Sequence, residues 1–136
     1  MKMLLTKKFA FEMAHALEGY DGKCANLHGH SYHLEVTVDA GMPTDGGSGM
    51  AIDFGSIKEI VQQTVIDRFD HALVLKEGSP LAAGQANLIT VPFNPTTENL
   101  LLHFASLLQN SMPCGVSLHS LRLAETDTSV AELILS

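Results

Sequence analysis

The chain has 136 residues, the size of one ordinary domain, and 46% of them are hydrophobic against 17% charged. This content supports one hydrophobic core and excludes a disordered chain. The formal net charge of −7 argues against non-specific binding to nucleic acid or to anionic membranes, since such proteins are normally basic. We therefore expect one domain over residues 1–136 that binds neither, although a local pocket can still accept a small anionic substrate.

The location of the protein is predicted from its N-terminus and its cysteines. Residues 1–8 lack the long apolar stretch and the cleavage site of a signal peptide, and no run of about 18 apolar residues predicts a membrane span. With only two cysteines, Cys24 and Cys114, a disulfide framework is not expected. These features predict a cytoplasmic protein in which Cys24 remains a thiol.

The first half of the chain predicts two strands and a helix. Residues 6–16 and 28–39 alternate apolar and polar side chains, which is typical of half-buried strands. The glycine-rich stretch 41–49 predicts a loop. Asp53 then precedes apolar residues at helical spacing and is placed to cap that helix. These apolar residues are Ile57, Ile60, Val61 and Val65.

The second half predicts a short strand over 87–93, a helix that starts at 95–99, and two closing strands over 115–125 and 129–135. The resulting order is strand, strand, helix, short strand, helix, strand, strand. It predicts an α+β domain with an antiparallel sheet and two helices over one face. Because such a small sheet leaves an edge that needs covering, we also expect an oligomer.

The main chemical motif is His28-Gly29-His30. Residues two apart on a strand project to the same face, so both imidazoles can reach one metal ion. The same face carries Tyr32 and apolar residues, so these histidines point inward and need a partner. His15, on the apolar face of the first strand, is the best candidate for a third ligand. Three histidines with an open position describe a catalytic zinc site, whereas a solvated His-x-His pair without function is the alternative.

Further candidate residues surround this motif. Cys24 can be a fourth ligand, a buried apolar residue, or a thiol whose pKa is lowered by Lys23 and the metal, and we favour the third interpretation. Asp70 can orient the imidazole of His71 for proton transfer, although a charge pair at a helix end is the simpler alternative. Glu125 ends an apolar strand, where its carboxylate can accept two hydrogen bonds from a flat heterocycle.

Several motifs in a fixed order resemble those of a known family. They are Cys24-Ala25-Asn26-Leu27-His28-Gly29-His30 with His15 upstream, Gly49-Met50-Ala51-Ile52-Asp53-Phe54, Phe69-Asp70-His71, Pro95-Thr96-Thr97-Glu98-Asn99 and Glu125-Thr126. The chain therefore resembles the 6-pyruvoyl-tetrahydropterin synthase / 6-carboxy-tetrahydropterin synthase family over nearly its whole length.

The resemblance implies the tunnelling fold, in which a four-stranded antiparallel sheet and two helices assemble into an oligomeric barrel. The barrel is usually a homohexamer with active sites between subunits. The resemblance also implies zinc on the three histidines, Cys24 as the proton-transferring base, and a relay completed by Asp70 and His71 of a neighbouring subunit. Glu125 would bind the pterin ring, helped by Thr96 and Thr97.

The spacing of the cysteine resembles one branch of this family. Three residues separate Cys24 from His28, as in the carboxy-tetrahydropterin synthases of queuosine biosynthesis. The implied reaction converts 7,8-dihydroneopterin triphosphate to 6-carboxy-5,6,7,8-tetrahydropterin, acetaldehyde and triphosphate. The alternatives are a pyruvoyl-tetrahydropterin synthase and a non-catalytic zinc- or pterin-binding module. Departures from the family pattern fall in loop and packing positions, at residues 72–76, Asp127 and Val130.

Overall fold

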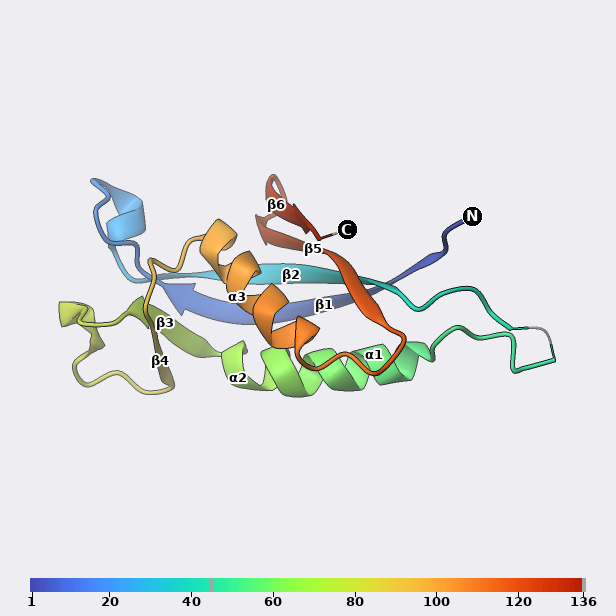
Figure 1. Ribbon diagram of the computed structural model, residues 1–136. Coiled ribbons are helices and arrows are strands. Elements are labelled where there is room, and N and C mark those ends of the chain that lie inside the picture. Colours follow the sequence, from blue (N-terminus) through green and yellow to red (C-terminus); the bar gives the residue numbers. More distant parts are fainter. Residues whose placement is uncertain (45, 136) are drawn as a thin grey trace.

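A computed structural model describes residues 1–44 and 46–135. Its centre is a curved six-stranded sheet with the order β4-β3-β1-β2-β5-β6 (Figure 1). The strands are β1 (Leu4–His15), β2 (His28–Asp39), β3 (Ala72–Lys76), β4 (Leu88–Val91), β5 (Ser117–Thr126) and β6 (Ser129–Ile134).

The antiparallel part of the sheet confirms four of the predicted strands. β1 pairs with β2 from Leu4 opposite Asp39 to His15 opposite His28, and β2 continues into β5 and β6. The side chains alternate as expected, since Phe11, Met13 and His15 are buried whereas Glu12 is exposed. This register brings the end of β1 beside the start of β2.

The expectation of a four-stranded, wholly antiparallel sheet is wrong, because β3 and β4 extend the sheet with parallel pairing. β3 pairs with the end of β1, and β4 pairs with β3. The segment 72–75 reads Ala-Leu-Val-Leu and is buried throughout, so it lacks the alternation of a half-buried strand. Parallel strands are covered on both faces and often have such continuous apolar runs. β4 lies within the strand predicted at 87–93.

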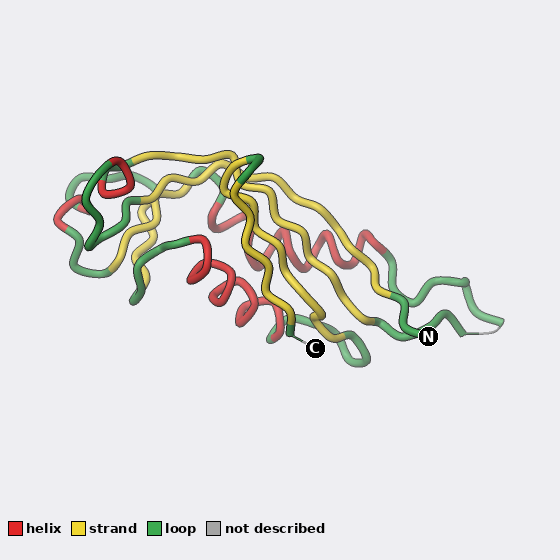
Figure 2. The backbone as a smooth tube through the Cα atoms, turned by 90° about the horizontal axis from the view of Figure 1, so that it is seen from above, coloured by secondary structure: helices red, strands yellow, loops and turns green. Residues whose placement is uncertain are grey.

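Two helical segments pack on one face of the sheet, as predicted (Figures 1 and 2). The first runs through α1 (Phe54–Val61), a π-helical turn (Gln62–Ile66) and α2 (Asp67–Phe69). Asp53 caps this segment by accepting a hydrogen bond from the Gly55 amide at 2.7 Å. The second is α3 (Thr97–Gln109), whose apolar side includes Leu100, Leu101, Phe104 and Leu108.

The hydrophobic core lies between this face and the helices. Phe11 stacks on Tyr32 with ring centroids 5.3 Å apart, and the ring of Phe104 meets that of Phe11 edge-on with centroids 6.2 Å apart. The predicted loop at 41–49 contains neither helix nor strand at residues 41–44 and 46–49, and Asp45 lies outside the described residues. None of the helices in the described part of the chain combines the length and apolar character that a membrane span requires. The oligomeric barrel and the cytoplasmic location stay predictions.

Candidate functional site

Three histidines form a compact cluster where β1 ends and β2 begins. One ring nitrogen of each of His15, His28 and His30 lies within 4.8 Å of the corresponding nitrogens of the other two. The ring centroids are 4.5 Å apart for His15 and His28, 4.9 Å for His28 and His30, and 5.3 Å for His15 and His30. Because His15 pairs directly with His28 in the β1–β2 register, the sheet itself brings these residues together. The cluster can hold a metal ion.

Backbone carbonyls set the orientation of two of these rings. Nδ1 of His15 donates to the Pro95 carbonyl at 2.8 Å, and Nδ1 of His28 donates to the Asn26 carbonyl at 2.7 Å. A carbonyl only accepts, so in each neutral ring the proton is on Nδ1 and Nε2 has a free lone pair. Outer contacts of this kind are typical of metal-binding histidines.

The electrostatic environment also suits a metal ion. Nε2 of His15 and Nε2 of His30 are buried and have no hydrogen-bond partner among the described residues, which is costly unless another group satisfies them. Burial lowers the pKa of His15, outweighing the opposite effect of its hydrogen bond to Pro95. His15 is therefore neutral at pH 7 and able to bind a cation.

Glu125 reaches this cluster from β5. Its Oε1 lies 3.5 Å from Nε2 of His15 and 3.5 Å from Nε2 of His30, and it accepts a long hydrogen bond of 3.4 Å from the Thr97 hydroxyl. Glu125 and Thr97 also line a cavity of about 500 Å³. The other lining residues are Glu98, Thr128, Ser129, Val130 and Ala131. A small polar molecule in this cavity would lie beside the metal cluster.

Thr96 and Thr97 have different positions at the start of α3. The Thr96 hydroxyl accepts from the Asn99 amide at 3.2 Å and so caps the helix. Thr97 instead directs its hydroxyl toward Glu125. Of the two, Thr97 is the one whose hydroxyl is directed to the cavity.

Cys24 lies in a short 3-10 turn (Lys23–Ala25) and is exposed. Its carbonyl accepts from the Leu17 amide at 2.8 Å, which fixes the turn against the end of the β1 region. Over the described ranges, the cluster of metal-binding atoms consists of the three histidines and does not include the Cys24 sulfur. The structure thus contradicts a buried apolar thiol and gives no support to a fourth ligand, while the third interpretation stays a prediction.

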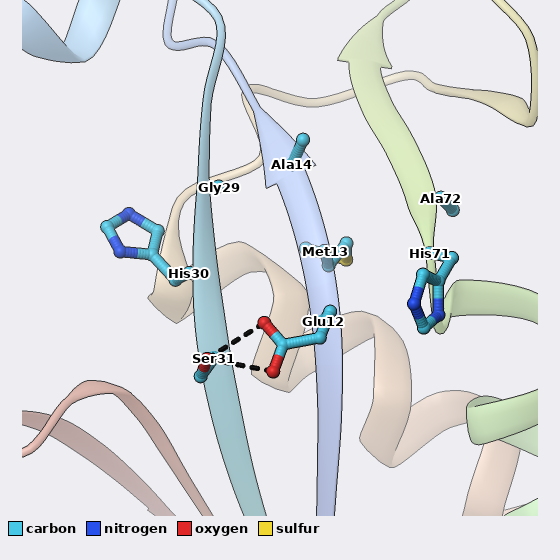
Figure 3. Close-up of a pocket in the computed structure, with 8 residues that line it drawn as sticks. All are labelled: Glu12, Met13, Ala14, Gly29, His30, Ser31, His71 and Ala72. Carbon is cyan, nitrogen blue, oxygen red and sulfur yellow. Dashed lines mark hydrogen bonds between the residues drawn. The ribbon is translucent and has the colours of Figure 1, made fainter.

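His71 lies beside β1, on the side away from β2. Figure 3 shows the His30 ring projecting from β2 away from His71, which lies beside the start of β3. Oδ1 of Asp70 is 2.9 Å from Nδ1 of His71 and accepts from the Glu12 amide at 3.0 Å. The His71 side chain is 74% exposed. The pair is therefore preformed but separate from the histidine cluster of its own chain.

The cavity around His71 is about 300 Å³ and lies over the outer face of β1 and β2 (Figure 3). Glu12 and Ser31 form part of its wall and are joined by hydrogen bonds of 2.8 Å. His71 itself has a positive φ of 64°, which is uncommon for a residue with a side chain. Its amide donates to the Glu12 carbonyl at 2.6 Å, and this contact supports the unusual conformation.

Two residues near the cluster were not found by sequence reasoning. Tyr32 is fully buried beside the rings of His15 and His30, and its hydroxyl has no hydrogen-bond partner among the described residues. Burial raises the pKa of this phenol, and the nearby Glu125 carboxylate adds to the effect. The alternation of β2 predicted the inward position of Tyr32 but not an unpaired hydroxyl.

Asn94 is the second. Its side chain accepts from the Glu18 amide and donates to the Glu18 carbonyl, both at 3.0 Å. Its carbonyl accepts from the Asn99 side chain at 2.9 Å. Asn94 thereby ties the segment after β1 to the start of α3, immediately before Pro95, whose carbonyl orients His15.

We expect Asn94→Ala to lower the affinity of the cluster for zinc about tenfold, because loss of such outer contacts typically costs about 10–100-fold. Asn94→Asp keeps the acceptor and loses only the donor, so its effect should be smaller. Zinc affinity is measured by competition with a chelator. Asn110→Ala, at the other end of α3, is the matched control. Equal affinity in Asn94→Ala and in the control would show that the contact does not support the metal site.

Comparison with known proteins identifies the family to which this chain belongs. A sequence profile described as 6-pyruvoyl tetrahydropterin synthase matches residues 4–134. The chain belongs to this family.

Particular relatives carry a more specific name. A Haemophilus influenzae protein called 6-carboxy-5,6,7,8-tetrahydropterin synthase is 36% identical, over 94% of this chain and 96% of its own length. A Rickettsia bellii protein of the same name is 38% identical over 72% of this chain and 74% of its own length.

Solved structures agree on the fold. A protein from Wolinella succinogenes superposes with a TM-score of 0.81 at 18% identity, covering 100% of this chain and 99% of that one. The Caenorhabditis elegans 6-pyruvoyl tetrahydropterin synthase gives a TM-score of 0.76 at 23% identity and covers 98% and 96% of the two chains. At these identities the likeness concerns the fold alone.

Proposed function

We propose that this chain is a zinc-dependent 6-carboxy-5,6,7,8-tetrahydropterin synthase. The substrates are 7,8-dihydroneopterin triphosphate and one water, and the products are 6-carboxytetrahydropterin, acetaldehyde and triphosphate. The observation that carries the proposal is the cluster of three histidines beside Glu125 and its cavity. The names of the relatives at 36% and 38% identity favour the carboxy branch over the pyruvoyl branch.

Zinc is the metal that best suits the donor set. His15, His28 and His30 offer three imidazole nitrogens, a ligand set found in catalytic zinc sites with an open position. The unpartnered Nε2 atoms of His15 and His30 are the two buried groups that such an ion would satisfy. When bound there, zinc supplies Lewis acidity, which makes C–H bonds next to a coordinated oxygen more acidic.

Cys24 is proposed as the base that takes a proton from the substrate side chain. Its exposure leaves the thiol accessible, and a cysteine accepts protons as its thiolate. A general base of this kind contributes about 10²–10⁴-fold to the rate.

The Asp70–His71 pair is proposed to serve the active site of a neighbouring subunit. Asp70 is fixed to β1 and orients the His71 ring, which is exposed and, over the described residues, lies outside its own chain's histidine cluster. Delivery of this ring to Cys24 of another copy agrees with a homo-oligomer, for which the family resemblance suggests a hexamer. His71 can then exchange a proton with the thiol while Asp70 stabilises the imidazolium.

Glu125 is proposed to bind the pterin ring. A carboxylate can accept two parallel hydrogen bonds from the N–H groups on the guanidine-like edge of the heterocycle. Thr97 lies beside it in the same cavity, and Thr96 holds the start of α3 in place.

Incubation of the zinc-loaded protein with 7,8-dihydroneopterin triphosphate tests this function. We expect acetaldehyde and 6-carboxytetrahydropterin in equal amounts, detected by aldehyde derivatisation and by mass spectrometry. Release of triphosphate with a pyruvoyl product and no acetaldehyde would assign the chain to the other branch. Zinc binding without turnover of any dihydroneopterin derivative would leave a non-catalytic binding module.

A further inference from the structure

The Glu125 carboxylate lies against the histidine cluster as well as at the cavity. Its Oε1 points at the histidine cluster and lies 3.5 Å from Nε2 of His15 and from Nε2 of His30. These contacts are not hydrogen bonds, because both Nε2 atoms lack a hydrogen-bond partner. In His15 the proton is on Nδ1, so a lone pair and a carboxylate oxygen face each other. Nε2 of His15 and Oε1 of Glu125 are thus two acceptors that face each other without a donor, and a cation between them would satisfy both.

The distances from Oε1 of Glu125 to Nε2 of His15 and to Nε2 of His30 match those between two ligands of one metal ion. Zinc binds imidazole nitrogen and carboxylate oxygen at about 2.0–2.2 Å, so two tetrahedral ligands lie roughly 3.4 Å apart. Oε1 is close to this separation from both His15 and His30. Over the described residues, the group of mutually close metal-binding atoms consists of the three histidine nitrogens, and Glu125 adds an oxygen beside two of them.

The carboxylate is also free to leave this position. The Glu125 side chain is 27% exposed, and its hydrogen bond from Thr97 is long, at 3.4 Å. It lines the 500 Å³ cavity, so a molecule in that cavity lies within its reach as well. One side chain can thus bind either the metal or a heterocycle.

We propose that Glu125 is the fourth ligand of the resting metal ion and that a bound heterocycle displaces it. The N–H groups of the heterocycle attract the carboxylate, and its departure opens the coordination position only when the cavity is filled. This proposal rests on the proposed zinc site and gives Glu125 a role before substrate binds. The metal ion would therefore gain an open coordination position only when the heterocycle is bound.

Cobalt substitution tests the proposal directly, because the visible bands of Co²⁺ change with the ligands that bind the ion. We expect Glu125→Gln and Glu125→Ala to bind Co²⁺ with visible bands at wavelengths different from those of the unmodified protein, because water replaces the carboxylate. Their zinc affinity should fall about tenfold or more, at least matching the loss of an outer contact. Glu132→Gln, which makes the same charge change on exposed β6, is the control.

Pterin without a side chain tests the displacement. It has the ring edge but no side-chain oxygen to reach the metal, and its fluorescence reports binding. We expect saturating pterin to shift the cobalt spectrum of the unmodified protein toward that of Glu125→Gln and to leave the variant's spectrum unchanged. Identical affinities and spectra for Glu125→Gln and Glu132→Gln would overturn the proposal. Failure of the unmodified protein to bind any metal would instead refute the proposed zinc-dependent function.

Discussion

Replacing His28 by alanine is expected to abolish tight zinc binding and, with it, turnover. The substitution removes one of three protein nitrogens that lie within 4.8 Å of each other. Because loss of an outer contact alone costs about 10–100-fold in affinity, we expect the loss of a direct ligand to exceed about 100-fold. Chelator competition measures the affinity, and elemental analysis gives the zinc content of the purified protein.

His28 suits this experiment because it is only half-buried, whereas His15 is fully buried. The fold should therefore survive, and circular dichroism checks it. Added zinc should raise the melting temperature of the unmodified protein, since a ligand of the native state stabilises it, but not that of His28→Ala. His33→Ala is the matched control, on the exposed face of the same strand. Full zinc content in His28→Ala would remove this residue from the metal site.

Cys24→Ala is expected to keep zinc and lose turnover. The thiol is exposed and its sulfur is outside the histidine cluster, so metal affinity should not change. If Cys24 is the base, the rate of acetaldehyde formation should fall about 10²–10⁴-fold, the range of a positioned acid–base group. Zinc content and acetaldehyde release, measured on the same preparation, separate the two effects.

Cys114→Ala is the control for Cys24, because both thiols are exposed and neither forms a disulfide. Its turnover should equal that of the unmodified protein. Loss of zinc from Cys24→Ala would make this residue a ligand and leave the base to be found elsewhere. Retained turnover with full zinc content would also contradict the proposed base.

The antiparallel strands, both helices and the three histidines could be predicted because their signals are local. Alternation along β1 and β2 fixes which side chains face inward, and neighbouring strands then place His15 beside His28. Asp53 marked the start of the first helix as its cap, and residues 95–99, with an acid in the first turn, marked the start of the second.

β3 could not be recognised by the same reasoning. A strand buried on both faces loses the polar positions that create alternation, and its parallel pairing with β1 joins segments far apart in sequence. The position of Asp70 and His71 relative to the histidine cluster could not be predicted for the same reason. It depends on where β3 begins beside β1. The hydrogen bonds between Asn94 and Glu18, and the Tyr32 hydroxyl without a partner among the described residues, depend on long-range contacts that no local pattern encodes.

The direct pairing of His15 with His28 has a consequence for how this site can diversify. The strand ends hold these two histidines, while residues 16–27 form a loop that starts and finishes at that pair. Strand pairing therefore fixes the backbone positions of His15 and His28, and the loop contributes the Asn26 carbonyl that orients the His28 ring. Exchanges around Cys24 that keep Asn26 can change the residue at the position of the thiol while the two histidines stay paired. This loop is therefore the natural place to introduce new chemistry beside the histidine cluster.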